Sequence, residues 1–152
     1  TGRPSPYGRY DILHATRYLD APNEPLYPFG YGLSYTDFTY SGIELSSNSM
    51  ECGGEITASV TITNAGKYKA KETVQLYIRD VAGSFVRPVK ELKGFEKIEL
   101  DVGESKKITF TITEEMLAFY GADMRRNAEK GKFHVFIGKD SDVETYQEFE
   151  LL

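Results

Sequence analysis

The feature that most limits how this chain can fold is a strict two-residue alternation between Glu55 and Asn64. Apolar residues at the even positions alternate with hydroxylated residues at the odd ones, and the apolar set is Ile56, Ala58, Val60 and Ile62. Because successive side chains of a strand point to opposite faces, this pattern predicts a β-strand with one buried face and one solvated face.

The same period returns in further segments, which are Glu72–Asp80, Ser105–Thr113, Lys132–Gly138 and Val143–Leu152. Two more expected strands, 38–45 and 89–100, are less regular, because their apolar parity changes at Gly42 and after Gly94. We therefore expect a β-bulge at each glycine or, at Gly94, a strand that switches between sheets.

Turn-forming residues separate these segments, at 64–66, 101–104 and 139–142. Thr113 is expected to cap a short helical turn that ends at Gly121. Met116, Leu117 and Phe119 of this turn are expected to close one end of the core. About seven short strands with turns between them and no long helix favour an antiparallel β-sandwich of immunoglobulin or fibronectin III type. The length of 152 residues suits one such domain with an extension.

A second feature lies before the strands, where residues 26–38 hold five of the aromatic residues in 13 positions. Pro28, Gly30 and Gly32 exclude a regular helix or strand there, so the segment should be irregular and should pack against something. Residues 1–25 contain four prolines and are interpreted as an extended connector. The expected organisation is therefore connector 1–25, aromatic segment 26–36 and sandwich 37–152.

The motif Pro-Leu-Tyr-Pro-Phe-Gly-Tyr-Gly-Leu-Ser-Tyr-Thr at 25–36 resembles the opening segment of the C-terminal domain of glycoside hydrolase family 3 enzymes. The likeness is greatest to bacterial periplasmic β-glucosidases. It extends to residues 1–4, 17–18, 73–77, 87–97 and 131–133, and so covers essentially the whole chain.

This resemblance implies a fibronectin III-like accessory domain of a β-glucosidase that hydrolyses terminal β-D-glucosyl residues with retention. The family's nucleophile lies in an N-terminal barrel domain, and its acid/base residue also lies outside the C-terminal domain. No catalytic residue, cofactor or metal ligand is therefore carried over to this chain. The resemblance also implies a periplasmic or secreted location.

The residues themselves offer few candidates for chemistry. A glycosidase needs two carboxylates flanking the bond, and Asp80, Glu91, Glu96 and Asp123 are available in loops or at outward positions. Nothing sets any pair apart, so solvated surface charge is the favoured interpretation.

Metal and nucleic-acid sites are disfavoured as well. His14, His134 and Cys52 lack the spacing of a metal site, and the single cysteine excludes an intrachain disulfide. With a net charge of −5 and scattered Lys and Arg residues, nucleic acid is not an expected partner. A membrane is not expected either, because no apolar run approaches the roughly 20 residues of a membrane-spanning helix.

Two roles remain. We expect that the aromatic segment docks the sandwich on the catalytic domains of the same parent chain, through residues Leu26, Tyr27, Phe29, Tyr31, Leu33 and Tyr35. The alternative is a carbohydrate-binding or cell-wall-binding module, in which outward Tyr77, Phe136 and Tyr146 form a sugar-stacking platform. The absence of Trp disfavours direct sugar binding. A generic adhesion module is a weaker third possibility.

Overall fold

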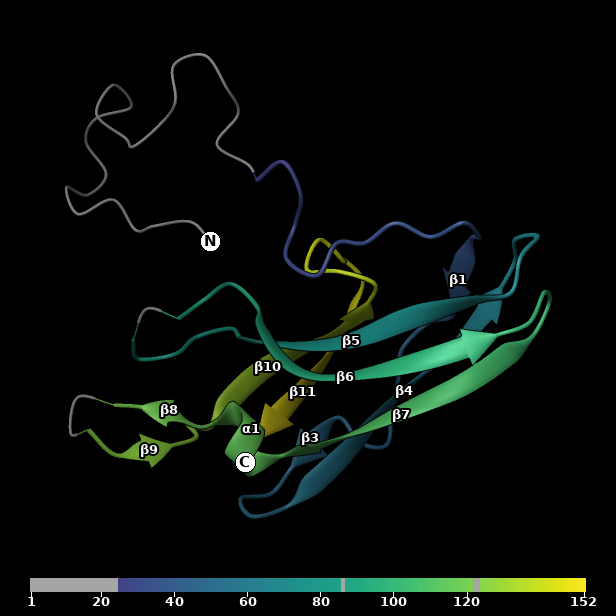
Figure 1. Ribbon diagram of the computed structural model, residues 1–152. Coiled ribbons are helices and arrows are strands. Elements are labelled where there is room, and N and C mark those ends of the chain that lie inside the picture. Colours follow the sequence, from purple (N-terminus) through teal and green to yellow (C-terminus); the bar gives the residue numbers. More distant parts are fainter. Residues whose placement is uncertain (1–24, 86, 122–123) are drawn as a thin grey trace.

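The computed structural model describes residues 25–85, 87–121 and 124–152, and shows two β-sheets packed face to face (Figure 1). Residues 1–24 of the expected connector, with His14, lie outside the described residues, as does Asp123. The predicted all-β sandwich is confirmed, and its expected strands are all present.

The first sheet is built around β4 (Glu55–Asn64), the strand predicted from the alternation. Strand β7 (Ser105–Thr113) pairs with one side of β4, and β1 (Phe38–Tyr40) and β2 (Glu44–Leu45) pair with the other, all antiparallel. Tyr40 pairs with Ile62 and Glu44 with Ser59, so one extra residue lies on the β1–β2 side. The bulge expected at Gly42 is confirmed.

The second sheet has the order β3 (Ser49–Met50), β11 (Tyr146–Leu151), β10 (Gly131–Gly138), β5 (Ala70–Asp80), β6 (Glu91–Leu100). Leu76 pairs with Gly94 but Tyr77 pairs with Leu92, which places the second expected bulge beside Gly94. Strand β6 stays in this sheet, so the idea of a strand that changes sheets is wrong.

Three local expectations need correction. Ser49–Met50 lies between the expected strands 38–45 and Glu55–Asn64, where a loop rich in Ser, Asn and Gly was expected, yet it forms β3 and pairs in parallel with β11. This pairing is a long-range contact that no local pattern indicates. Thr113 stands at the start of α1 (Glu114–Leu117), but its side chain makes no capping hydrogen bond. Residues 139–145 all belong to the loop before β11, which is longer than the four-residue turn expected. A small hairpin of β8 (Phe119–Tyr120) and β9 (Arg126–Asn127) completes the described strands.

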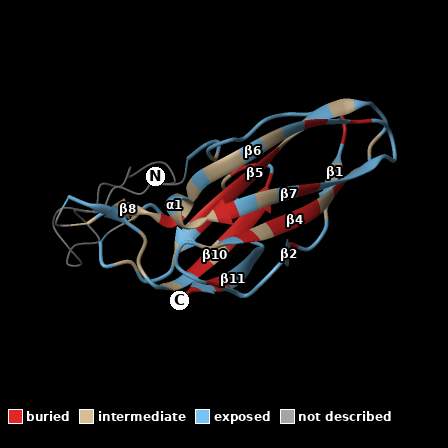
Figure 2. Ribbon diagram, turned by 90° about the horizontal axis from the view of Figure 1, so that it is seen from below, coloured by how far each residue is buried: buried red, intermediate tan, exposed pale blue. Residues whose placement is uncertain are grey.

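The core lies between the two sheets, where the buried residues of β4, β5, β7 and β10 face one another (Figure 2). Ile56, Ala58, Val60 and Ile62 are all buried, as the alternation predicted. Leu117 closes one end of this core from α1, whereas Met116 and Phe119, which were expected beside it, are only partly buried. The sandwich therefore has a continuous interior of its own, and the aromatic segment lies outside it.

Candidate docking surface

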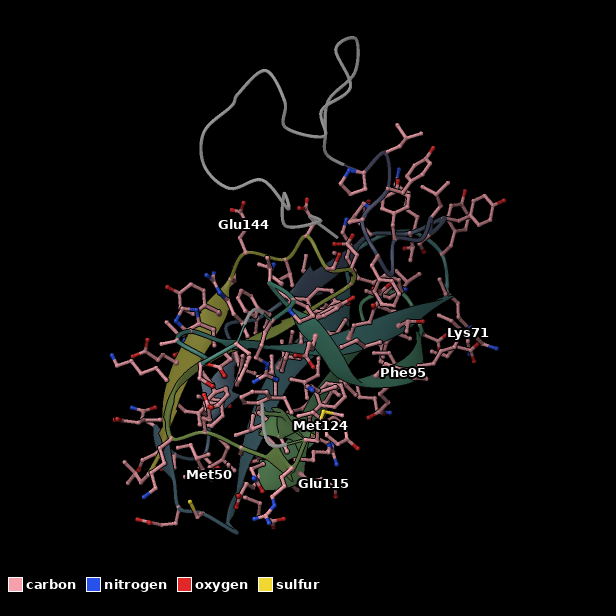
Figure 3. All side chains as sticks on the ribbon, turned by 90° about the vertical axis from the view of Figure 1, so that its left-hand side faces the viewer. Met50, Lys71, Phe95, Glu115, Met124 and Glu144 are labelled. Atoms are coloured by element: carbon pink, nitrogen blue, oxygen red, sulfur yellow. The ribbon has the colours of Figure 1, made fainter. Side chains whose placement is uncertain are left out.

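The aromatic segment leaves its large side chains uncovered. The exposed fractions are 87% for Leu26, 62% for Tyr27, 66% for Phe29, 42% for Tyr31, 89% for Leu33 and 94% for Tyr35. These are the residues that the sequence predicted for docking. Figure 3 shows the side chains of this part of the chain projecting from one corner of the sandwich, above Phe95 and Lys71.

The backbone of the segment is held to the second sheet at Phe29 and Gly30. The buried Gln75 side chain donates from Nε2 to the carbonyl oxygens of Gly30 (3.1 Å) and Lys139, and its Oε1 accepts from the Tyr77 hydroxyl (2.6 Å). The Ser141 amide donates to the Phe29 carbonyl oxygen over 2.9 Å. Buried amide groups must be satisfied in this way, so Gln75 fixes the path of the segment.

A second attachment holds the end of the segment. The buried Thr36 hydroxyl donates to Asn64 Oδ1 over 2.7 Å, and the Ala65 amide donates to the Asp37 carbonyl oxygen over 2.8 Å. Asn64 is itself fully buried, and its Nδ2 donates to the Leu100 carbonyl oxygen. The segment is thus held at Phe29–Gly30 and again at Thr36, and the side chains of Tyr31, Leu33 and Tyr35 between these points are exposed.

Two of the three aromatic residues of the alternative sugar-stacking platform are covered by other parts of the chain. Tyr77 and Phe136 lie outside the core cluster, as expected for outward residues, but they are only 1% and 3% exposed. The Tyr77 hydroxyl reaches the Phe29 carbonyl oxygen at 3.4 Å, and Lys90 Nζ lies 4.4 Å from the centre of the Phe136 ring. The expected exposure of these two rings is wrong, because segments far away in sequence cover them. Tyr146 alone of the three is exposed.

The carboxylates do not form a glycosidase pair in the described part of the chain. Asp80 and Glu91 do come together, contrary to expectation, because Arg87 donates to both over 2.9 Å and Lys93 donates to Glu91 over 2.7 Å. Burial alone would raise the pKa of Glu91, but the hydrogen bonds and charges of Lys93 and Arg87 outweigh it and lower that pKa.

Both carboxylates are therefore engaged by cations, which is unsuited to a general acid. Glu96 is a surface residue, as expected, and pairs with Lys106 at 3.2 Å.

His134 and Cys52 do not form a metal site. The His134 ring stacks on Tyr146 at a centroid distance of 4.0 Å, and its Nε2 lies 3.2 Å from Glu148. The exposed Cys52 thiol donates to the Leu152 carbonyl oxygen over 3.1 Å. Within the described ranges, no three His, Cys, Asp or Glu side chains gather closely enough to hold a metal ion.

Two hollows border the aromatic segment. One, of 590 Å³, lies between the segment and the loop 139–145, and the other, of 380 Å³, lies beneath Gly30–Thr36 over β5. Between them the Tyr40 hydroxyl donates to Glu72 over 2.7 Å, and burial raises the pKa of both groups. The surface around the segment is thus ridged and hollowed rather than flat.

The described residues form no helix with the length and apolar character that crossing a membrane requires.

Comparison with known proteins links the chain to carbohydrate-active enzymes. Residues 72–141 match the Fibronectin type III-like domain family. The chain is 52% identical over 139 residues to a periplasmic β-glucosidase of Salmonella typhimurium, with 91% of this chain and 18% of that protein covered. It is 38% identical over 128 residues to a β-xylosidase of Formosa agariphila, with 84% of this chain and 18% of that protein covered.

A solved structure also matches the chain closely. The β-glucosidase from Listeria innocua, determined in complex with gluconolactone, superposes with a TM-score of 0.84 at 41% identity. The match covers 99% of this chain and 21% of that one. The chain therefore spans about a fifth of the length of these relatives.

Proposed function

Because this chain belongs to the fibronectin type III-like domains in the C-terminal region of glycoside hydrolase family 3 β-glucosidases, we propose that it is a non-catalytic accessory domain that docks on the catalytic domains of its parent chain. The docking surface consists of Leu26, Tyr27, Phe29, Tyr31, Leu33 and Tyr35. The proposed organisation is connector 1–25, docking segment 26–36 and sandwich 37–152.

One observation carries this proposal: the six large side chains are exposed, and the backbone that carries them is held to the sandwich at Phe29–Gly30 and at Thr36. Contiguous exposed apolar surface is unfavourable in water and marks interaction sites in soluble proteins. A flexible segment would lose conformational entropy on binding, whereas one held by Gln75 and Asn64 loses less. Such a prearranged apolar surface suits a permanent contact within one chain.

The proposed activity of the parent is hydrolysis of terminal β-D-glucosyl residues with retention, in the periplasm or outside the cell. Its support is the relatives named as β-glucosidases, one of which is named as periplasmic. A β-xylosidase is also among the relatives, so domains of this kind accompany enzymes named for different sugars. This agrees with a domain that supports the catalytic part without selecting the substrate.

The test compares one double substitution in two settings, the 152-residue chain and the parent enzyme. Truncation of exposed residues changes stability by about 0.5 kcal/mol or less, whereas truncation of buried aromatic residues costs about 3–5 kcal/mol. Tyr27→Ala with Phe29→Ala should barely move the denaturation midpoint of the 152-residue chain. In the parent it should lower thermal stability or activity.

Val60→Ala is the control, because Val60 is buried in β4 and should be required in both settings. If the Tyr27 and Phe29 pair destabilises the 152-residue chain as strongly as Val60→Ala does, these rings belong to the sandwich and the docking proposal fails.

A further inference from the structure

The larger hollow beside the docking segment combines apolar walls with an acidic rim. Its volume is 590 Å³, and its walls include Tyr31, Tyr40, Ile43 and Val143. Asp140 and Asp142 line the same hollow from the loop that follows β10, the loop marked by Glu144 in Figure 3. Tyr31 belongs to the docking segment as well, so the hollow is continuous with the proposed docking surface.

Asp140 is the unusual member of this site. Its residue is only 5% exposed, yet within the described part of the chain its one hydrogen bond comes from the Asp142 amide to Oδ1, over 3.0 Å. Carboxylates are rarely buried to this degree without a cationic partner, because the loss of hydration is costly. The second carboxylate oxygen of Asp140 accepts no hydrogen bond from the described residues and keeps contact with solvent, so it is open to a donor that enters the hollow.

Neither nearby lysine forms an ion pair with Asp140 among the described residues. Lys139 also lines the hollow, and its charge acts on Glu72. Lys90 Nζ donates to the carbonyl oxygens of Ser141 and Val143; burial lowers the pKa of Lys90, and the charges of Asp142, Glu144 and Asp140 oppose that without a direct contact. Burial raises the pKa of the Tyr40 hydroxyl, Glu72 adds to the rise, and the negative charge of Asp140 adds further.

We propose that this hollow receives the side chain of an arginine or lysine from the catalytic domains of the parent chain. The aliphatic stem packs on the apolar walls, and the charged end pairs with Asp140 and Asp142. Arg and Lys are the residues that combine these two chemistries. The occupant belongs to the parent because the chain spans only 18% to 21% of its relatives, and the inference rests on the docking function proposed above.

The test is Asp140→Asn in the 152-residue chain and in the parent enzyme. In the 152-residue chain the substitution removes one of two neighbouring negative charges and keeps the Oδ1 acceptor, so the thermal midpoint should stay or rise. In the parent the cation loses its partner. Hydrogen exchange of the amides in loop 139–145 should then become about fivefold faster or more.

Asp142→Asn is the second variant, because Asp142 is exposed and its substitution cannot prevent folding; it should act in the same direction with a smaller effect. Asp101→Asn is the matched control, since Asp101 is an exposed aspartate paired with Lys69 away from the hollow. It should leave exchange in loop 139–145 unchanged.

Two results would overturn the inference: unchanged exchange in the parent, or equal destabilisation of both proteins by Asp140→Asn. The Tyr27→Ala and Phe29→Ala double variant distinguishes this inference from the docking proposal. If the double variant lowers the stability or activity of the parent but Asp140→Asn does not change exchange there, the docking proposal is supported and the cation site is rejected. If neither variant has an effect in the parent, docking itself fails.

Discussion

At the residue scale, the arrangement of the docking segment depends on how closely Gly30 approaches Gln75. Gly30 has a φ of +81°, and a Cβ at this position would lie 2.1 Å from Gln75 Oε1. Both facts require glycine, because other residues resist positive φ and would displace the buried amide. The same amide also holds the Tyr77 hydroxyl and the loop carbonyl at Lys139.

Gly30→Ala should therefore destabilise the 152-residue chain by more than about 1 kcal/mol, through backbone strain and loss of the Gln75 contacts. Gly32→Ala is the matched control in the same segment, because a Cβ at Gly32 meets nothing within 4 Å. Urea denaturation of the two variants makes the comparison. Equal midpoints would show that the Gln75 attachment does not hold the segment.

Glu72 gives a prediction for pH. Burial raises the pKa of its carboxyl above the ordinary value for glutamate, with Asp140 adding to the rise and the hydrogen bond from Tyr40 and the charge of Lys139 opposing it. A raised folded pKa means that the protonated carboxyl favours folding. That contribution is fully present below the unfolded pKa and is lost as the pH rises through the folded pKa.

Glu72→Gln resembles the protonated form and keeps an acceptor for the Tyr40 hydroxyl. It should raise the stability of the 152-residue chain near pH 7, and the gain should disappear at about pH 4 and below. Denaturant melts across this range measure the difference between variant and wild type. The same substitution at exposed Glu99 is the control, and a gain at Glu72 that does not change with pH would contradict the burial argument.

At the element scale, the loop between β5 and β6 is held by Arg87. Its guanidinium bridges Asp80 at the end of β5 and Glu91 at the start of β6, lies 3.4 Å from the Leu117 carbonyl oxygen of α1, and stacks over Phe119 at 4.5 Å. The Arg87 and Asp80 side chains are only 11% and 7% exposed. One side chain therefore joins two strands, the helix and the small hairpin.

Removing one partner of a buried ion pair costs about 3–5 kcal/mol, because the remaining charge stays buried without compensation. Arg87→Ala should lower the free energy of unfolding towards that range. Lys106→Ala breaks the exposed pair with Glu96 and should change stability by about 1 kcal/mol or less. If guanidinium denaturation gives equal losses for both variants, the network is no stronger than a surface ion pair.

At the scale of the whole molecule, two of the carboxylates and two of the aromatic rings considered for sugar chemistry are engaged within the domain. Asp80 and Glu91 are held by cations, and Tyr77 and Phe136 are covered by the chain itself. The docking segment and the acidic hollow remain open, and they lie side by side. Its free surface thus suits contact with protein better than chemistry on a sugar.

The 152-residue chain should accordingly hydrolyse no chromogenic β-glucoside above the buffer rate. Glucose, cellobiose and laminarin should give no saturable heat in calorimetry at millimolar concentration. Turnover that survives repurification and disappears in a carboxylate variant would contradict the accessory role. Binding abolished by Tyr146→Ala, the one exposed residue of the supposed platform, would favour the carbohydrate-binding alternative.

The sequence by itself determined the sandwich and its main strands. Alternation such as that of Ile56 to Ile62 depends only on the two-residue period of a strand and on the free energy of burying apolar side chains. Both bulges could be located as well, because a change of parity at Gly42 and near Gly94 is visible in one segment. The irregular path of the aromatic segment was predicted for a similar reason, since its prolines and glycines exclude it from the sheets.

Only the tertiary structure decided how this segment lies against the sandwich and which surfaces stay open. Tyr77 and Tyr146 have the same outward parity, yet Phe29 reaches one and not the other. Asp80 and Glu91 form one network because Arg87 lies between them. Asp140 lies between Lys139 and Ser141, whose backbone groups form hydrogen bonds with Gln75 and Phe29. These contacts join residues far apart in sequence, and a local pattern carries no information about such pairs.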